Sequence, residues 1–284
     1  MAASDGEQVM LKWDGHTHTR FCKHGSPAAQ ELYIEAALAQ GFTRYTLSEH
    51  PPLPERWVED ENLMAELAMS MDELPAYFEY VESVKRKYEG IIEITAGLEV
   101  DYLAGAEAFS EAMLQPWAGV LEDIVVSVHY LPGTGGMRCI DFTPGDFTEG
   151  LLAAYGSVDA VVSEYYNHVE KAIAWASRLP GRVRLGHINL IEKFRTALPQ
   201  MDEDLIRRRL AGIIPMLAAA GMGVDVNTAG LRVPTCGKTY VPEWMIRECT
   251  ARGIPCVYGS DSHKPEHVGF GWEWYERAVS GQRG

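Results

Sequence analysis

The sequence has few basic residues and no long apolar run, and each shortage excludes a class of function. Lysine and arginine number 25 against 40 aspartates and glutamates, so the 284-residue chain carries a net charge of −15. A nucleic-acid-binding surface needs clustered basic side chains, and we expect no such partner. The stretch nearest to a membrane span, residues 211–224, is broken by Pro215, Gly221 and Gly223. We therefore expect no contact with a membrane.

Cysteine is scarce and irregularly spaced. The five cysteines are an odd number without a CxxC pair, which argues against disulfides and against a thiolate zinc site. The first ten residues lack the basic start and apolar core of a secretory signal. These features favour a cytoplasmic protein.

The remaining composition is that of a globular chain. Hydrophobic residues make up 46% and charged residues 23%, which excludes disorder as the dominant state. No linker rich in Pro, Gly and Ser divides the chain. We expect one domain, residues 1–284, with a short flexible N-terminus at residues 1–8.

Short segments dense in β-branched residues alternate with helix-like segments. The predicted strands are 9–16, 43–50, 91–99, 123–129, 182–187, 223–227 and 255–261. The predicted helices are 26–41, beginning at Ser26-Pro27 and ending at Gly41, then 72–88, 158–178, 202–220 and 242–252. This alternation predicts a parallel sheet, most naturally a closed barrel. We expect the long second-to-third and fourth-to-fifth connections to carry extra turns and loops.

Most of the nine histidines fall where a predicted strand ends. Residues i and i+2 of an extended strand point the same way, so His16 with His18 and Asp261 with His263 can each chelate an ion. The carboxyl ends of parallel barrel strands share one rim, where imidazoles and carboxylates form a divalent-metal site. The candidate ligands are His16, His18, His24, His50, Glu99, His129, His187, Asp261 and His263.

Nine ligands are too many for one ion, because a catalytic zinc commonly uses about three protein ligands. They are adequate for two or three ions if a carboxylate bridges. His24 lies in a loop, and its spacing alone does not decide whether it is a ligand. His168 is expected to be partly exposed or locally bonded, and His267 to lie on the surface. Asp101 is either an alternative ligand or a partner of a neighbouring ligand.

Seven motifs occur in the order DGHTHTRFCKHG, LSEHPPLP, AGLEVDY, VVSVHYL, GHINLIEKF, NTAGLR and GSDSH. Together they resemble the polymerase-and-histidinol-phosphatase (PHP) metallophosphoesterases. The segment MDELPAYFEYVESVKRKYEGIIEITAGLEVDYL is similar to the middle region of the bacterial monofunctional histidinol-phosphatases. The resemblance covers nearly the whole chain. It implies an α/β fold, a distorted (β/α)7 barrel of the PHP type with the metal site at the C-terminal rim of the strands.

The resemblance also implies two to three divalent ions, zinc, iron or manganese, in a trinuclear centre. His16, His18, Glu99 and Asp261 would hold the first ion. Glu99 would bridge to a second ion held by His24 and His50, with His129 as a further candidate, and the remaining histidines would complete a third. The segment LPGTGGMRCIDF departs from the family pattern, so the resemblance does not describe the loop on the substrate side.

The implied activity is hydrolysis of L-histidinol phosphate to L-histidinol and phosphate, a step of histidine biosynthesis. The predicted catalytic residues are Glu99, Asp261, His263 and Arg195. Lys193, Arg195 and Arg232 lie just beyond strand ends and are predicted to bind phosphate, with surface salt bridges as the alternative. Candidates for recognising histidinol are Phe21, Glu49 and Tyr102.

Two other functions fit the same motifs. One is a PHP-type phosphoesterase acting on nucleotides or another small phosphomonoester, since the metal rim serves either substrate. The other is a metal-binding protein without catalysis, although storage has no use for a phosphate clamp. In each enzymatic case the partner is a small phosphomonoester, and the sequence does not predict the oligomeric state.

Overall fold

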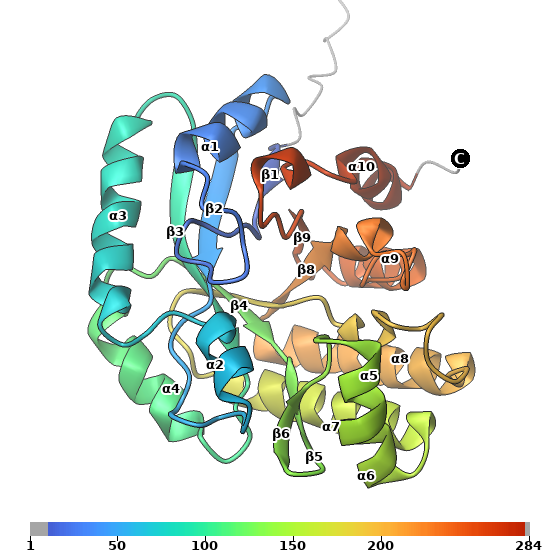
Figure 1. Ribbon diagram of the computed structural model, residues 1–284. Coiled ribbons are helices and arrows are strands. Elements are labelled where there is room, and N and C mark those ends of the chain that lie inside the picture. The colour runs from blue at the N-terminus through green and yellow to red at the C-terminus, as the bar shows by residue number, and fades with distance from the viewer. Residues whose placement is uncertain (1–10, 282–284) are drawn as a thin grey trace, which may run out of the picture.

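The computed structural model describes residues 11–281, and a seven-stranded parallel sheet forms its centre (Figure 1). The strand order in the sheet is β1-β2-β3-β4-β7-β8-β9, so each connection leads to the neighbouring strand. The strands are β1 (Trp13–Asp14), β2 (Arg44–Glu49), β3 (Glu93–Asp101), β4 (Asp123–Ser127), β7 (Arg182–Leu185), β8 (Gly223–Asn227) and β9 (Cys256–Gly259).

The two edges of this sheet meet. Thr17 forms a parallel bridge with Ser262, and the Gly15 N–H donates to the carbonyl of Tyr258 at 2.8 Å. The sheet is therefore a nearly closed barrel, and the expected seven-stranded α/β barrel is confirmed.

The predicted strands are all present, with small differences at their ends. The first is the shortest, because β1 holds only Trp13 and Asp14 of the predicted segment 9–16. Residues 9 and 10 of that segment, and the predicted N-terminal segment 1–8, lie outside the described residues. Strand β3 runs two residues past its predicted end at Glu99 and so includes Asp101.

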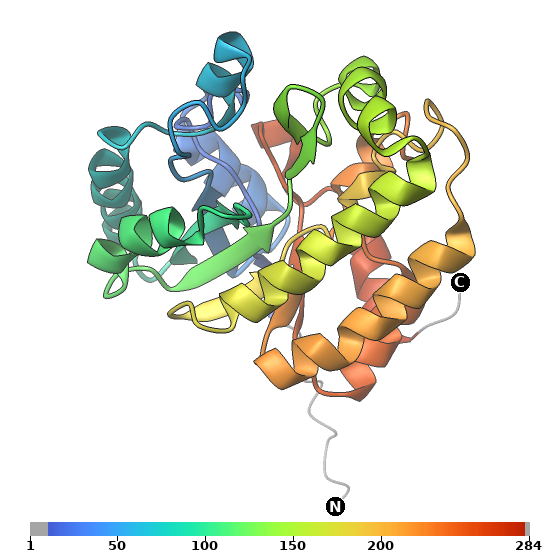
Figure 2. The same ribbon diagram turned by 90° about the horizontal axis from the view of Figure 1, so that it is seen from below.

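Helices lie outside the sheet, and the long helices α7 and α8 lie side by side (Figure 2). No helix of residues 11–281 is long and apolar enough to cross a membrane. The helices are α1 (Gln30–Ala39), α2 (Glu61–Leu67), α3 (Glu73–Lys87), α4 (Glu107–Leu114), α5 (Pro144–Asp146), α6 (Ala153–Tyr155), α7 (Val158–Ala176), α8 (Glu203–Ala220), α9 (Glu243–Ala251) and α10 (Trp272–Ser280). A π-helical segment, η2 (Phe147–Leu152), joins α5 to α6, and short 3₁₀ segments are η1 (Gln115–Trp117), η3 (Leu190–Glu192), η4 (Ala229–Arg232) and η5 (Pro265–His267).

The predicted start of the first helix is wrong. Helix α1 begins at Gln30, four residues after Ser26. The Ser26 N–H donates instead to the carbonyl of His263 at 2.8 Å, which ties this loop to the end of the last strand. The predicted end is confirmed, because Gly41 follows α1 with a φ of 77°, a left-handed conformation that glycine adopts without strain.

The two long connections contain more structure than the expected loops. Helix α2 lies in the first, and the second contains the antiparallel hairpin of β5 (Tyr130–Gly133) and β6 (Gly136–Cys139), followed by α5 and α6. The hairpin turns at Thr134 and Gly135, between the paired residues Gly133 and Gly136, and Gly135 has a φ of 81°. Helix α2 and the hairpin lie at the same end of the barrel (Figure 2).

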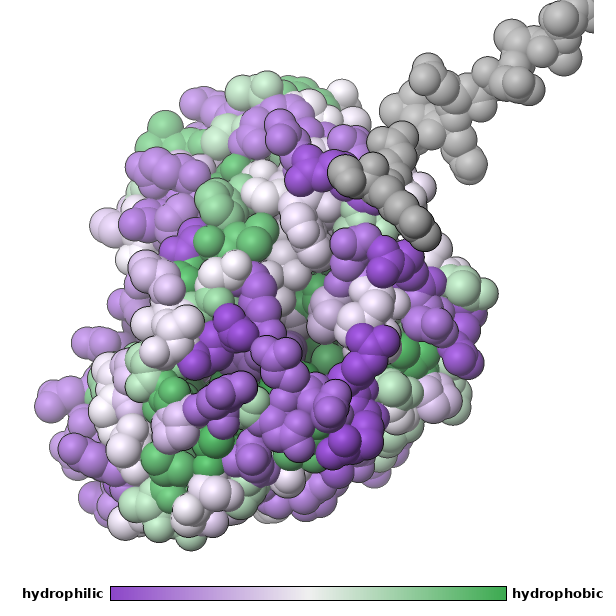
Figure 3. Space-filling view, turned by 90° about the vertical axis from the view of Figure 1, so that its right-hand side faces the viewer, coloured by the Kyte–Doolittle hydropathy of each residue, from purple (hydrophilic) through white to green (hydrophobic). Residues whose placement is uncertain are grey.

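The barrel interior contains a charged layer as well as apolar side chains. Arg184 on β7 is fully buried, and its Nε donates to the Asp123 carboxylate at 3.1 Å. Pairing of this kind is what keeps a buried charge tolerable. The outer face in Figure 3 is mostly hydrophilic, with apolar residues in scattered groups. All five cysteines are free, as predicted.

Candidate metal centre and substrate pocket

Strand ends bring eight of the nine predicted ligands to one rim of the barrel, and His24 reaches it from the loop between β1 and α1. His16 and His18 follow β1, His50 follows β2, Glu99 lies near the end of β3, and His129 follows β4. His187 follows β7, and Asp261 and His263 follow β9. Asp261 has a φ of 52° and is held by its N–H, which donates to the carbonyl of His16 at 2.8 Å. Aspartate is among the residues that tolerate this left-handed conformation, so the turn can aim a carboxylate inward.

Glu99 lies at the centre of this rim, and its two carboxylate oxygens face different histidines. Oε2 lies 3.0 Å from His16 Nε2 and 3.4 Å from His18 Nε2. Oε1 lies 2.8 Å from His187 Nε2 and 3.6 Å from His129 Nε2. Burial by itself raises the pKa of Glu99, but the charges of the surrounding histidines outweigh it and hold the pKa well below its usual range.

The potential ligand atoms form overlapping groups within 4.8 Å of one another. Three of them share no histidine: His16, His18 and Asp261; Glu99, His129 and His187; and His24, His50 and His263. The grouping differs from that implied by the resemblance, because His24 lies beside His263, with 3.1 Å between their Nε2 atoms, and not beside Glu99.

The residues present fit bound cations. The Nε2 atoms of His16 and His18 are buried and make no hydrogen bond, an arrangement that costs free energy unless something else binds them. Burial lowers the pKa of His50 and of His263 well below the usual range, although Glu99 opposes it at His50 and Asp261 at His263. Both imidazoles are therefore neutral, which is the form that binds metals.

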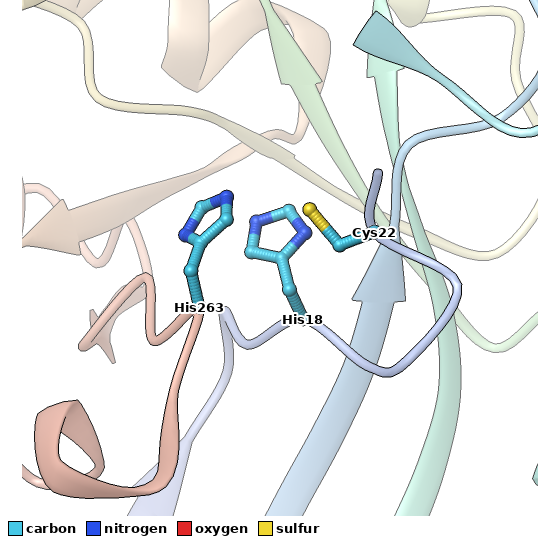
Figure 4. A group of neighbouring side chains, drawn as sticks. All are labelled: His18, Cys22 and His263. Carbon is cyan, nitrogen blue, oxygen red and sulfur yellow. The ribbon is translucent and has the colours of Figure 1, made fainter. Parts of the chain in front are cut away.

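Cys22 also lies near this rim, on the opposite side of the His18 ring from His263 (Figure 4). Burial raises the pKa of its thiol to about 12, so the sulfur is protonated at neutral pH. The Nδ1 atom of His18 lies 3.1 Å from the Glu49 carboxylate. Cys22 forms a further group with His18 and His263, whose potential ligand atoms lie within 4.8 Å of one another.

A pocket of about 400 Å³ opens above the rim. Its inner wall consists of His24, His50, Glu99, His129, His187, Asp261 and His263. Its outer wall comes from α2, the β5–β6 hairpin and the loops after β7, β8 and β9, and includes Leu63, Glu66, Leu67, Tyr130, Cys139, Asp141, Phe142, Leu190, Lys193, Ala229, Arg232, Val233, Tyr240 and His267.

Known proteins share both the sequence and the architecture. A PHP domain model matches residues 14–229, and a PHP-associated model matches residues 246–281. The histidinol-phosphatase of Bacillus subtilis is 36% identical over 264 residues, which cover 93% of this chain and 98% of that enzyme. The chain belongs to the PHP family.

Solved structures support the same assignment. The hisK protein of Listeria monocytogenes has a TM-score of 0.87 and 34% identity, with 93% of this chain and 100% of that chain covered. A histidinol phosphate phosphatase from Lactococcus lactis, solved with zinc, L-histidinol and phosphate, shares the fold with a TM-score of 0.71 at 15% identity, over 95% of this chain and 93% of that one. The barrel is thus of the PHP type, and a PHP enzyme uses divalent metal ions.

Two of the three predicted phosphate-binding residues line the pocket of this PHP protein. The Arg232 guanidinium donates to the carbonyl of Ser260 at 2.7 Å and to that of Asp261 at 2.5 Å. Lys193 lies 2.8 Å from the Asp141 carboxylate, and although burial opposes it, this carboxylate raises the pKa of Lys193. Lys193 therefore stays charged beside the ligands.

Arg195, predicted as a phosphate-binding and catalytic residue, does not line the pocket. Its guanidinium lies 3.3 Å from Glu203 and 3.6 Å from Glu192. It is the surface salt bridge that the sequence left as an alternative. A position six to eight residues past a strand end does not decide which way a side chain points.

The three candidates for histidinol recognition are also outside the pocket lining. Glu49 is fully buried and bonded to His18 and Thr19. Phe21 packs against Tyr77 and Tyr80, and the Tyr102 hydroxyl donates to Glu107. The outer wall offers Tyr130, Phe142 and Tyr240 instead, and Phe142 belongs to the segment that departs from the family pattern.

Three further titratable residues, His168, His267 and Asp101, have predicted roles outside the ligand set. His168 is locally bonded as predicted, with Nδ1 3.1 Å from the carbonyl of Glu164. His267, expected on the surface, is half-buried and lines the outer wall. Asp101 lies 2.6 Å from His129 Nδ1, which makes it the partner of a neighbouring ligand.

Proposed function

We infer that this protein is a metal-dependent phosphomonoesterase that hydrolyses L-histidinol phosphate to L-histidinol and phosphate. The observation that carries the substrate is the 36% identity to the Bacillus subtilis histidinol-phosphatase, which runs through 98% of that enzyme. The pocket agrees with it, because metal ligands and two cationic side chains face the same space. A metal store has no need of such cations.

We propose three metal positions on the inner wall. His16, His18, Glu99 and Asp261 would form the first, Glu99, His129 and His187 the second, and His24, His50 and His263 the third. The support for Glu99 as a bridge is that its two oxygens face the first and the second set separately. Imidazole and carboxylate ligands accept zinc, iron and manganese, and we propose one of these as the native metal.

Divalent ions, when bound, supply an activated water and neutralise charge on a phosphoryl group. The chain itself contributes the walls that hold the ester. Arg232 is fixed by two carbonyl groups and Lys193 by Asp141, so both present positive charge without needing to reorder. We propose that they bind the phosphoryl oxygens by charge-assisted hydrogen bonds. Such preorganised charge stabilises the transition state of phosphoryl transfer.

The outer wall would then meet the rest of the substrate. Its carboxylates, Glu66 on α2 and Asp141 after the hairpin, are placed to attract the ammonium group of histidinol. The exposed ring of Phe142 and the ring of Tyr240 line the same wall and are suited to pack against an imidazole. An anionic substrate can enter a protein of net charge −15 because the local field of the pocket, not the net charge, meets it.

The deciding experiment is phosphate release from a panel of monoesters by the purified, metal-loaded protein. The panel should contain histidinol phosphate, nucleoside monophosphates, glycerol phosphate and p-nitrophenyl phosphate. We expect kcat/KM for histidinol phosphate to exceed the others by at least about 100-fold, the scale that a few specific polar contacts provide. A higher kcat/KM for a nucleotide would replace this substrate with the alternative PHP activity.

A further inference from the structure

Three buried carboxylates that line no part of the pocket stand behind three of the proposed ligands. Asp225 Oδ2 lies 2.8 Å from His16 Nδ1, and Glu49 Oε1 lies 3.1 Å from His18 Nδ1. Asp101 Oδ1 lies 2.6 Å from His129 Nδ1. In each case the other ring nitrogen, Nε2, points towards Glu99. Each carboxylate thus fixes which nitrogen of its histidine is free to bind a cation.

The position of Asp225 is built into the barrel. A side chain at Gly259 would meet the Asp225 carboxylate at 2.1 Å, so the absence of one leaves the space that the carboxylate occupies. The buried Arg184 guanidinium lies 3.7 Å from Asp225 Oδ1, and the Asn227 amide donates to Asp225 Oδ2 at 3.2 Å. Groups on three neighbouring strands, β7, β8 and β9, thus hold the Asp225 carboxylate beside His16.

The third set of ligands lacks this support. His24 Nδ1 bonds to the carbonyl of Glu66 at 2.8 Å, and His263 Nδ1 to the carbonyl of Asp261 at 3.1 Å. Within residues 11–281, the carboxylates paired with His50 and His263 are the ligands Glu99 and Asp261 themselves. His24 is also exposed, whereas His16 and His18 are fully buried.

The charge of the ligands differs in the same direction. The first proposed position has two carboxylate ligands and the second has one, whereas the third has three imidazoles and no carboxylate. A divalent cation at the third position keeps its full charge uncompensated by its own ligands, and it lies nearest to water. Both differences weaken its binding relative to the other two.

We propose that Asp225, Glu49 and Asp101 are positioning residues that raise the metal affinity of the first two positions. The ions at these positions are held tightly, whereas the ion at His24, His50 and His263 exchanges readily. This proposal rests on the metal centre proposed above but not on the identity of the substrate. A histidine whose Nδ1–H is bonded to a carboxylate is a more basic ligand, and removal of such a partner typically costs about 10- to 100-fold in metal affinity.

The test is metal retention by the full chain loaded with zinc. The protein is equilibrated with increasing concentrations of a chelator, and the bound zinc is counted by elemental analysis after the chelator is removed. We expect one equivalent to leave first and the others to leave at chelator concentrations at least about 10-fold higher. Loss of all zinc in one step would overturn the proposal.

Variants assign the steps to residues. His24→Ala should lack the early step and keep the late one unchanged, whereas Asp225→Asn and Asp101→Asn should move the late step to about 10- to 100-fold lower chelator. The asparagine keeps the shape and the acceptor but removes the charge. Lys238→Ala, a surface lysine paired with Glu192, is the matched control and should retain zinc like the parent.

Each variant is first checked for the parent's circular dichroism spectrum, and the two carboxylates lie behind different histidines, so misfolding of one leaves the other as a test. A late step unchanged in a folded Asp225→Asn or Asp101→Asn variant would overturn the proposal. So would a His24→Ala variant that loses the late step. Graded retention together with no hydrolysis of histidinol phosphate would instead refute only the proposed substrate.

Discussion

The inner and outer walls of the pocket differ in how their side chains are held. On the inner wall the side chains leave the ends of hydrogen-bonded strands, and their direction follows from the strand. On the outer wall they come from α2, a hairpin and loops, and individual ion pairs fix them, such as Lys193 with Asp141. The proposed metal ligands thus lie mostly at the ends of sheet strands, where geometry is fixed, and the proposed substrate contacts lie on α2, the hairpin and loops.

The difference predicts that changes on the inner wall are the more damaging, and Glu99→Gln should have the largest effect. The variant keeps the shape but removes the charge that lies between two sets of histidines. Two cations a few ångströms apart repel strongly without an anion between them. We expect loss of roughly two metal equivalents and nearly all activity, measured by elemental analysis and phosphate release. His24→Ala should lose about one equivalent. Full metal content and normal turnover in Glu99→Gln would exclude a bridge.

On the outer wall the largest effect is expected from Arg232→Ala. Loss of a charge-assisted hydrogen bond to phosphate should lower kcat/KM by an amount that corresponds to about 1.5–3 kcal/mol of transition-state stabilisation, with the metal content unchanged. Arg195→Ala is the control, because its guanidinium pairs with Glu192 and Glu203 outside the pocket. It should change kcat/KM by less than about 0.5 kcal/mol. Equal effects of the two variants would remove Arg232 from the proposed site.

The same difference explains what could be predicted from the sequence. Strand ends are marked by runs of β-branched residues, and period-2 geometry places His16 with His18 and Asp261 with His263, so the rim could be predicted. Sequence spacing leaves two roles open for Asp101, because it cannot distinguish a ligand from the residue bonded to that ligand. Only the fold brings Asp101 within 2.6 Å of His129.

The outer wall could not be predicted in the same way. Arg195 and Lys193 are two residues apart on one short segment, but one pairs with Glu203 on α8 and the other with Asp141 after the hairpin. Asp141 is 52 residues from Lys193 along the chain, whereas Glu203 is only eight residues from Arg195. The direction of Lys193 therefore depends on tertiary structure, and Arg195 turns to a local partner. The candidate role of Glu49 in recognising histidinol is uncertain from the sequence for a related reason. A carboxylate next to a ligand at a strand end can face the core as readily as the pocket, and Glu49 is fully buried.

Lys193→Ala should have a smaller effect than Arg232→Ala. The ammonium is already bonded to Asp141, which shares its charge with any phosphate in the pocket. We expect kcat/KM to fall by an amount that corresponds to about 1 kcal/mol of transition-state stabilisation. The inhibition constant of inorganic phosphate should rise to match. Lys238→Ala is the control, since that lysine pairs with Glu192 and does not line the pocket. An unchanged inhibition constant in Lys193→Ala would show that this lysine only anchors Asp141.

The smallest expected effect concerns stability and its pH dependence at Asp141. Burial by itself raises the pKa of this carboxyl, but Lys193 outweighs burial and lowers the pKa below its usual range. Because the folded pKa lies below the unfolded value of about 3.9, the stabilisation is fully present above that pH and is lost as the pH falls through the folded pKa. Asp141→Asn should therefore lower Tm at pH 7, and the difference from the parent should shrink below about pH 4.

Tm is measured by circular dichroism with chelator present, so that loss of metal at low pH does not contribute. Glu203→Gln, which breaks an exposed pair with Arg195, should change Tm little at either pH. A Tm difference for Asp141→Asn that is as large at pH 3 as at pH 7 would mean that the lost charge is not what stabilises the outer wall.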